Sequence, residues 1–110
     1  MDALESIGGG VYRLDELRER VLLVFAHSEC PTSRLALGRL GPLGPALAER
    51  GVRLVCVVQE PLETAARMAR QQGIEALVLA ERPPYEAARA FAVETVPTTI
   101  LLASDGAVEG

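Results

Sequence analysis

The stretch FAHSECPTSR, residues 25–34, decides the fold. It begins within the continuous apolar run Val21–Ala26, which is typical of a strand covered on both faces of a sheet. Pro31 suits the first position of a helix, where the missing N–H of proline costs nothing. The sequence therefore predicts that Cys30 lies where a buried strand ends and a helix begins.

A thiol at this position has the surroundings of a nucleophile. The unpaired N–H groups and the positive end of the helix dipole would face the Cys30 sulfur and favour the thiolate, which is the reactive species in disulfide exchange. The alternative is a cysteine that caps the helix without chemistry, because free cysteine is among the most buried residue types. Cys30 alone leaves both interpretations open.

Strands and helices alternate along the rest of the chain. Residues 1–10 are predicted to be a flexible lead-in, and Pro61 and Pro83–Pro84 are expected to open two of the helices. The alternation indicates one α/β domain, residues 1–110, with a mostly parallel central sheet and helices on both faces. The strands after the first are predicted at Val52–Val58, Ala76–Ala80 and Thr98–Ala103, the last closed by the turn residues 104–106.

A second motif, Thr95-Val96-Pro97-Thr98, lies immediately before the last strand. Together with the strand, loop, cysteine and helix upstream, it resembles the thioredoxin superfamily over roughly residues 11–106. In that superfamily a cis-proline loop faces the reactive cysteine and presents backbone groups to the incoming peptide or thiol. The resemblance implies a cis Val96–Pro97 bond close to the Cys30 sulfur. The substrate-binding residues that it implies are Pro31, Thr32, Val96, Pro97 and Thr98.

The resemblance is closest to the TlpA-like, or redoxin, branch. A helix–strand insertion, at about residues 74–91, lies between the two motifs, and plain thioredoxins lack it. Its strand is expected near an edge of the sheet. The chain stops at Gly110, before the family's last strand and helix, so we expect a truncated C-terminal end.

The chain departs from the family at the second cysteine of the C-x-x-C motif, which reads Cys30-Pro31-Thr32-Ser33. A serine hydroxyl can donate a hydrogen bond to the thiolate, but it cannot form a disulfide. We therefore expect a thiol–disulfide oxidoreductase in which Cys30 and Ser33 are catalytic and an external thiol resolves the mixed disulfide. Val24 and Gly38 also replace a buried acid and a helix-bending proline of thioredoxins.

Three side chains near Cys30 are candidate modulators of its pKa. A protonated His27 would stabilise the thiolate, Glu29 would oppose it, and Arg34 could attract an anionic thiol substrate. Cys56 lies inside a predicted strand and is interpreted as a structural thiol that is not bonded to Cys30. No cofactor is expected, and the cysteines and histidine predict no metal site.

Two other functions compete with the oxidoreductase. A redox-inactive thioredoxin-fold module could bind a peptide in the groove between Cys30 and Pro97, because the second cysteine is missing. A thiol peroxidase of the thiol-specific antioxidant type is a minor alternative. Its signature, P-x-x-x-T/S-x-x-C, has lost the proline at Leu23 and the hydroxyl at His27.

Composition limits the partners. The net charge of −4 argues against nucleic acid and anionic membranes, although all 11 basic residues are arginine. No run approaches the ~18 apolar residues of a membrane span. The N-terminus lacks the features of a secretory leader, which predicts a cytoplasmic protein, or an extracytoplasmic one if a leader was removed. The expected partner is a protein or low-molecular-weight thiol or disulfide.

Overall fold

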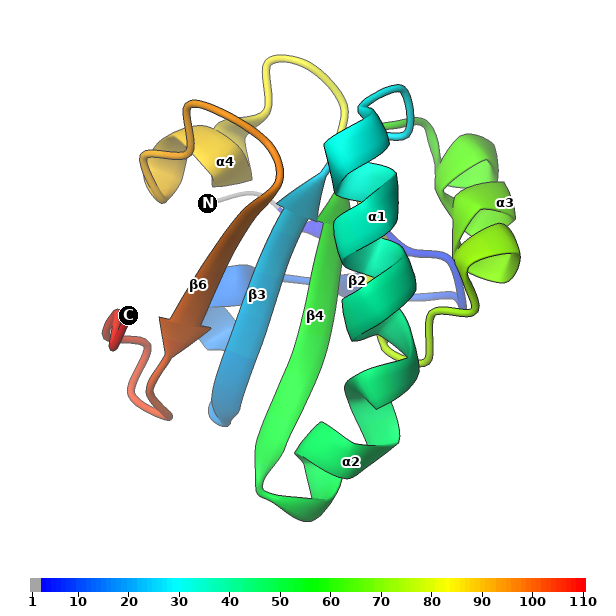
Figure 1. Cartoon of the computed structure of the whole chain (residues 1–110). Helices are drawn as coiled ribbons and strands as arrows, with labels where there is room; N and C mark the ends of the chain where they lie inside the picture. Colours follow the sequence, from blue (N-terminus) through cyan, green and yellow to red (C-terminus); the bar gives the residue numbers. More distant parts are fainter. Residues whose placement is uncertain (1–2) are drawn as a thin grey trace.

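A six-stranded sheet forms the centre of the computed structural model, which describes residues 3–110 (Figure 1). Its strands lie in the order β2-β1-β5-β4-β3-β6. They are β1 (Leu4–Ser6), β2 (Val11–Tyr12), β3 (Arg20–Ala26), β4 (Val52–Val58), β5 (Leu77–Ala80) and β6 (Thr98–Leu102). The helices are α1 (Pro31–Leu40), α2 (Gly44–Glu49), α3 (Leu62–Gln72) and α4 (Glu86–Ala90), with short 3₁₀ turns η1 (Leu14–Glu16) and η2 (Gly41–Leu43).

The α/β class is confirmed, but the sheet is mixed. Only the central strands β5, β4 and β3 pair in parallel, because helical crossovers connect them. The outer pairs β3–β6, β5–β1 and β1–β2 are antiparallel. Beyond β6 the chain turns at residues 104–106, as predicted, and the Leu101 N–H donates to the Gly110 carbonyl at 2.7 Å.

The prediction of a flexible lead-in is wrong for Leu4–Ser6, which forms β1. Gly9 and Gly10 have φ values of 100° and 80° and close a tight turn that folds β1 onto β2. β1 also pairs with β5, so β5 is not at the edge of the sheet as expected. Residues 1–2 of that lead-in lie outside the described part of the chain.

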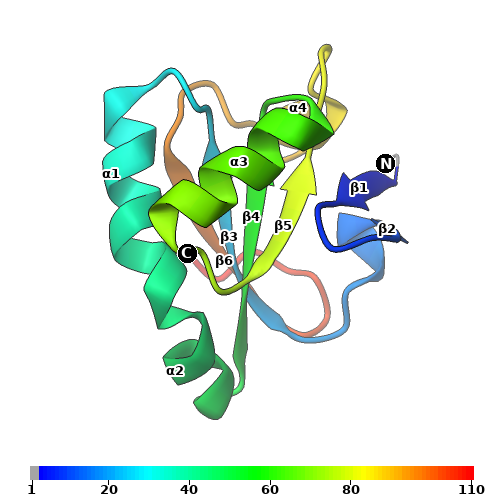
Figure 2. The ribbon, with the colours of Figure 1, turned by 90° about the vertical axis from the view of Figure 1, so that its right-hand side faces the viewer.

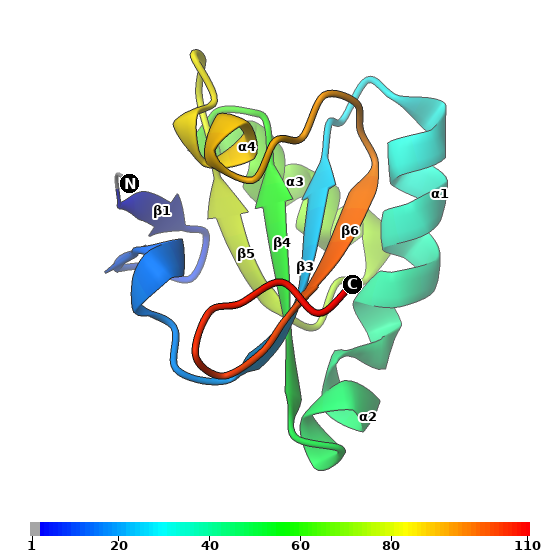
Figure 3. The ribbon, with the colours of Figure 1, turned by 90° about the vertical axis from the view of Figure 1, so that its left-hand side faces the viewer.

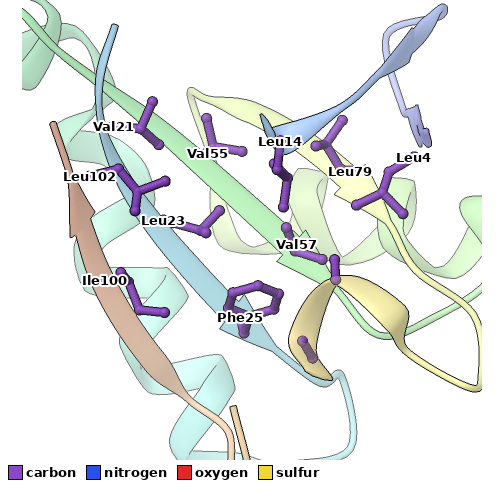
Figure 4. Close-up of a cluster of buried hydrophobic side chains, with 12 residues drawn as sticks. Leu4, Leu14, Val21, Leu23, Phe25, Val55, Val57, Leu79, Ile100 and Leu102 are labelled. Atoms are coloured by element: carbon purple, nitrogen blue, oxygen red, sulfur yellow. The ribbon is translucent and has the colours of Figure 1, made fainter. Parts of the chain in front are cut away.

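The core consists of two apolar layers, one on each face of the sheet, so the prediction of helices on both faces is confirmed. One face packs against α1 and α3, which contribute Leu37 and Met68. The other face packs against η1 and α4, and Phe25 from β3 lies at its centre (Figure 4). α3 lies in front of the sheet in Figure 2 and behind it in Figure 3. Because side chains alternate along a strand, successive residues of β3 pack into opposite layers.

The helix expected at Pro83–Pro84 begins later, at Glu86. The Pro83–Pro84 bond is cis and Tyr85 has a φ of 56°, so these residues form a turn. The N-terminus of α4 is capped from outside by the carboxylate of Glu81, which accepts from Ala87 N–H at 2.8 Å and Ala88 N–H at 3.2 Å. Burial of Glu81 raises its pKa, and these two hydrogen bonds oppose that rise.

No helix in residues 3–110 is long and apolar enough to cross a membrane.

Candidate functional site

Cys30 is the N-cap residue of α1. That helix follows β3 after a short loop at the carboxyl end of the strand (Figure 1). Its backbone is extended, with φ −88° and ψ 114°, and Pro31 occupies the first turn of the helix. The Sγ atom accepts a hydrogen bond from the Ser33 backbone N–H at 3.4 Å. The cysteine side chain therefore takes the place of the oxygen that usually caps a helix.

This environment holds the pKa of the Cys30 thiol below its usual value. The hydroxyl of Ser33 makes the largest contribution, followed by the Ser33 backbone N–H, and Thr32 adds smaller hydrogen bonds. Desolvation opposes the shift, with an effect smaller than that of either Ser33 hydrogen bond but larger than those of Thr32. Hydrogen bonds to the charged form favour the thiolate, so the site stabilises the nucleophilic state.

Ser33 is fully buried and connects the two sides of the loop. Its Oγ atom accepts a hydrogen bond from the His27 backbone N–H at 3.2 Å, while its own N–H donates to Cys30. One residue thus ties the end of β3 to the first turn of α1. The sulfur is held in position by a short network within the loop.

The loop before β6 lies against the sulfur. The carbonyl oxygen of Val96 is 3.7 Å from Cys30 Sγ, and the Val96–Pro97 bond is cis. The Thr98 hydroxyl donates to the Thr95 carbonyl at 2.5 Å and braces the loop from within. The resemblance implies this contact between the two motifs, which are 66 residues apart in the chain.

The three predicted modulators make their contacts with other groups. His27 Nδ1 is 3.3 Å from Glu60 Oε1 and accepts a hydrogen bond from the Glu29 N–H at 3.1 Å. The Arg34 guanidinium donates to the Ser28 carbonyl at 2.7 Å. The groups that lower the pKa of Cys30 are on Ser33 and Thr32 instead.

Sequence reasoning missed Glu60. Its carboxylate accepts a hydrogen bond from the Ser28 hydroxyl and faces His27, so it anchors the loop from the neighbouring strand. Glu60 lies two residues after β4, which is parallel to β3. Because the carboxyl ends of parallel strands meet at one edge of a sheet, the sequence could have predicted that Glu60 lies near the loop after β3.

Cys56 lies in β4, fully buried, and its register partner on β3 is Val24. Burial raises its pKa to about 12, and both cysteines are free thiols. The prediction of a buried Cys56 inside a strand is confirmed. No cluster of three or more His, Cys, Asp or Glu side chains that could hold a metal occurs among residues 3–110.

Comparisons with known proteins agree with this geometry. The model of the AhpC/TSA family matches residues 3–110. Comparison with curated protein sequences gave no match.

Solved structures of bacterial proteins have the same fold. StoA from Bacillus subtilis has a TM-score of 0.80 at 18% identity, and the match covers 99% of this chain and 84% of that chain. A thiol-disulfide oxidoreductase from Bacteroides fragilis gives 0.82 at 18%, covering 99% and 85%. A secreted Mycobacterium tuberculosis disulfide oxidoreductase, homologous to E. coli DsbE, gives 0.79 at 15%, covering 97% and 79%. At these identities the likeness shows the thioredoxin-like fold alone.

Proposed function

Since the chain belongs to the AhpC/TSA family, in the redoxin branch of the thioredoxin superfamily, we propose that it is a thiol–disulfide oxidoreductase with one nucleophilic cysteine, Cys30. The observation that carries this proposal is the environment of its sulfur. Hydrogen bonds from Ser33 lower the pKa of Cys30, and the thiol remains accessible. A thiolate that is stabilised and exposed is suited to attack a disulfide.

The reaction proceeds by three exchanges at sulfur. The Cys30 thiolate attacks one sulfur of the substrate disulfide, a bond to Cys30 forms, and the other substrate sulfur leaves as a thiolate. An external thiolate then attacks the Cys30 sulfur and releases the second half of the substrate. A second molecule of the external thiol frees Cys30 and leaves as the symmetric disulfide. The substrate disulfide gains two electrons, and two external thiols lose them.

Residues around the sulfur have separate roles in this proposal. Ser33 stabilises the thiolate, both before attack and as the leaving group at release. Pro31 and Thr32, exposed in the first turn of α1, contact the substrate on one side. Val96, Pro97 and Thr98 contact it on the other side, where the Val96 carbonyl already lies near Sγ. Backbone groups at Val96 offer hydrogen bonds to an extended peptide without selecting its sequence.

The central experiment follows a test peptide disulfide with and without glutathione. We expect turnover only with glutathione, and a Cys30 mixed disulfide, detected by mass spectrometry, without it. Cys30→Ser should abolish both results. Ser33→Cys should restore an internal disulfide and make the first turnover independent of glutathione. Cys56→Ser is the matched control, since it removes a thiol that burial keeps from reacting.

Two competing functions have distinct outcomes in this experiment. A redox-inactive binding module, favoured by the missing second cysteine, would bind the peptide but form no mixed disulfide. A thiol peroxidase, favoured by the family match, would consume peroxide through a Cys30 sulfenic acid. In this chain Leu23 is buried in the sheet and His27 faces Glu60, so the peroxide-positioning contacts are missing. We therefore expect oxidation of Cys30 by peroxide at the rate of an ordinary thiolate.

A further inference from the structure

A polar pocket of about 200 Å³ opens between α1 and α3, beside the loop that carries Cys30. It is lined by Ser28, Arg34, Thr64, Arg67, Met68 and Gln71. These residues come from three segments that the fold brings together, the β3–α1 loop, α1 and α3 (Figures 1 and 2). No function described so far uses this pocket.

The walls of the pocket follow from helical periodicity. Thr64, Arg67, Met68 and Gln71 are spaced i, i+3, i+4 and i+7, so they occupy one face of α3. Met68 is buried and packs into the core on this face of the sheet, while the three polar residues stand above it. Farther along α1 the helices approach closely, because a Cβ atom at Gly38 would lie 2.8 Å from Gln72 Oε1.

The pocket is positively charged within an acidic protein. Arg34 and Arg67 line it, no carboxylate does, and neither arginine forms an ion pair within residues 3–110. The carboxylate of Glu60, which contacts the same loop, is engaged by the Ser28 hydroxyl and lies 3.3 Å from His27 Nδ1. Guanidinium groups beside hydroxyl and amide donors fit a carboxylate, which accepts several hydrogen bonds at once.

Arg34 also connects the pocket to the reactive loop. Its Nη1 atom donates to the Ser28 carbonyl at 2.7 Å, two residues before Cys30, and its remaining N–H groups have no protein partner within residues 3–110. The Val96 carbonyl approaches Sγ from the β6 side of this loop, whereas the pocket lies on the α3 side. The pocket is therefore separate from the Val96 contact, since neither Cys30 nor Val96 lines it.

We propose that this pocket binds the carboxylate of a low-molecular-weight thiol and thereby selects an anionic thiol as the external reductant of Cys30. The inference rests on the proposed function, whose second exchange needs such a thiol. The carboxylate binds between the two arginines, and the thiolate of the same molecule reaches the mixed disulfide from the α3 side. The half-substrate held at Val96 then leaves on the other side.

The test measures the second exchange by itself. Cys30 is converted to its mixed disulfide with thiopyridine, an uncharged leaving group, and its release is followed by absorbance. Three small thiols are compared after correction for their thiolate fractions: mercaptopropionate, mercaptoethanol and cysteamine, which are anionic, neutral and cationic. Arg67→Gln removes one pocket charge. Arg70→Gln, on the same helix but outside the pocket, is the control for the general loss of positive charge.

We expect Arg67→Gln to lower the rate of thiopyridine release by mercaptopropionate about fivefold, which is the effect of one ion pair at a partly exposed site. Mercaptoethanol should change less than about twofold, and cysteamine should not slow. The Arg70→Gln protein should behave like the parent. Equal losses in the two arginine variants would show a general field effect and overturn the proposal. An unchanged mercaptopropionate rate in Arg67→Gln would overturn it as well.

A binding measurement separates this inference from the proposed function. Methylthiopropionate, which carries the carboxylate but no thiol, is titrated into the Cys30→Ser protein and followed by NMR. Shifts of the Thr64, Arg67 and Gln71 amides that disappear in Arg67→Gln support the pocket even if Cys30 proves inert in exchange. If Cys30 exchanges without charge selectivity and these shifts are absent, the proposed oxidoreductase function is supported and the proposed carboxylate site is overturned.

Discussion

The two cysteines lie on neighbouring strands of one sheet, yet their surroundings act on the thiols in opposite directions. Cys30, just beyond the end of β3, is partly exposed and receives hydrogen bonds from Ser33, which lower its pKa. Cys56, inside β4, is surrounded by apolar side chains, and burial raises its pKa to about 12. A cysteine at a strand end, beside the free N–H groups of the next helix, is therefore nucleophilic, whereas a cysteine inside a strand is an inert core residue.

Selective alkylation gives the largest expected contrast. At pH 7 a thiol with a pKa of about 12 is ionised to about one part in 10⁵, whereas an ordinary thiol is ionised to a few parts in 10². Iodoacetamide should therefore label Cys30 at least about 10³ times faster than Cys56. Peptide mass spectrometry of the native protein measures the ratio. In denaturant the two rates should converge, and comparable labelling in the native state would break the comparison.

The stability at high pH gives the next largest effect. The pKa of Cys56 is raised on folding, from 9.0 to about 12, so its contribution to stability is complete below pH 9 and is lost as the pH rises toward 12. The loss amounts to about 1.4 kcal/mol per pH unit in that window. Cys30 has a lowered pKa and acts with the opposite sign, since its thiolate is favoured in the folded state.

Urea unfolding of the parent and of Cys56→Val at pH 8 and above isolates this loss, because all other groups are common to both proteins. The variant should have a flatter profile in the alkaline range. At neutral pH its free energy of unfolding should fall by no more than about 1–3 kcal/mol, since valine adds about one methyl group at this buried position and suits a strand. Parallel alkaline profiles would contradict the burial of the Cys56 thiol.

Ser33→Ala probes the other half of the comparison, with an effect of about tenfold or less. Without the hydroxyl the pKa of Cys30 should rise, and alkylation at neutral pH should slow accordingly. The pH dependence of thiolate absorbance measures the shift directly. Because His27 N–H also loses its acceptor, circular dichroism must show that the variant is folded. Ser104→Ala, at an exposed turn, is the control, and an unchanged Cys30 titration in Ser33→Ala would contradict the assignment.

The smallest effect is expected for His27→Gln. His27 faces Glu60, and the hydrogen bonds that lower the pKa of Cys30 come from other residues. The alkylation rate of Cys30 should therefore change less than about twofold. A change as large as that in Ser33→Ala would restore His27 as the main modulator of the thiolate. The same alkylation assay serves both variants.

The sequence predicted the elements whose signals are local. The strands β3 and β4 follow from apolar runs, and the start of α1 follows from the proline after Cys30. Each of these signals depends on neighbouring residues alone, and together they locate the reactive thiol. β1 could not be predicted in this way. Leu4–Ser6 is short and partly polar, and it becomes a strand by pairing with β2 and with β5, of which β5 lies far along the chain.

In the candidate site, too, the contacts with local signals were predicted and the tertiary contacts were not. Backbone N–H groups facing the sulfur were predicted from the helix N-terminus, and the Ser33 N–H is one such group. The partners of His27 and Arg34 depend on which elements pack around the loop, and they were not predicted. Glu60 approaches from the loop after β4, and the pocket beside Arg34 is completed by α3. These contacts are tertiary, so no local pattern encodes them.

The position of β3 has a consequence for how the molecule opens. β3 pairs with β4 from Arg20 to Ala26 and with β6 from Val21 to Phe25, so its backbone is bonded along both edges. Amides held in this way exchange with solvent only when most of the structure unfolds, whereas terminal strands such as β2 fray locally. Hydrogen exchange should therefore rise steeply across the few residues between Phe25 and Cys30. The reactive loop is therefore attached at its start to the last part of the protein to open.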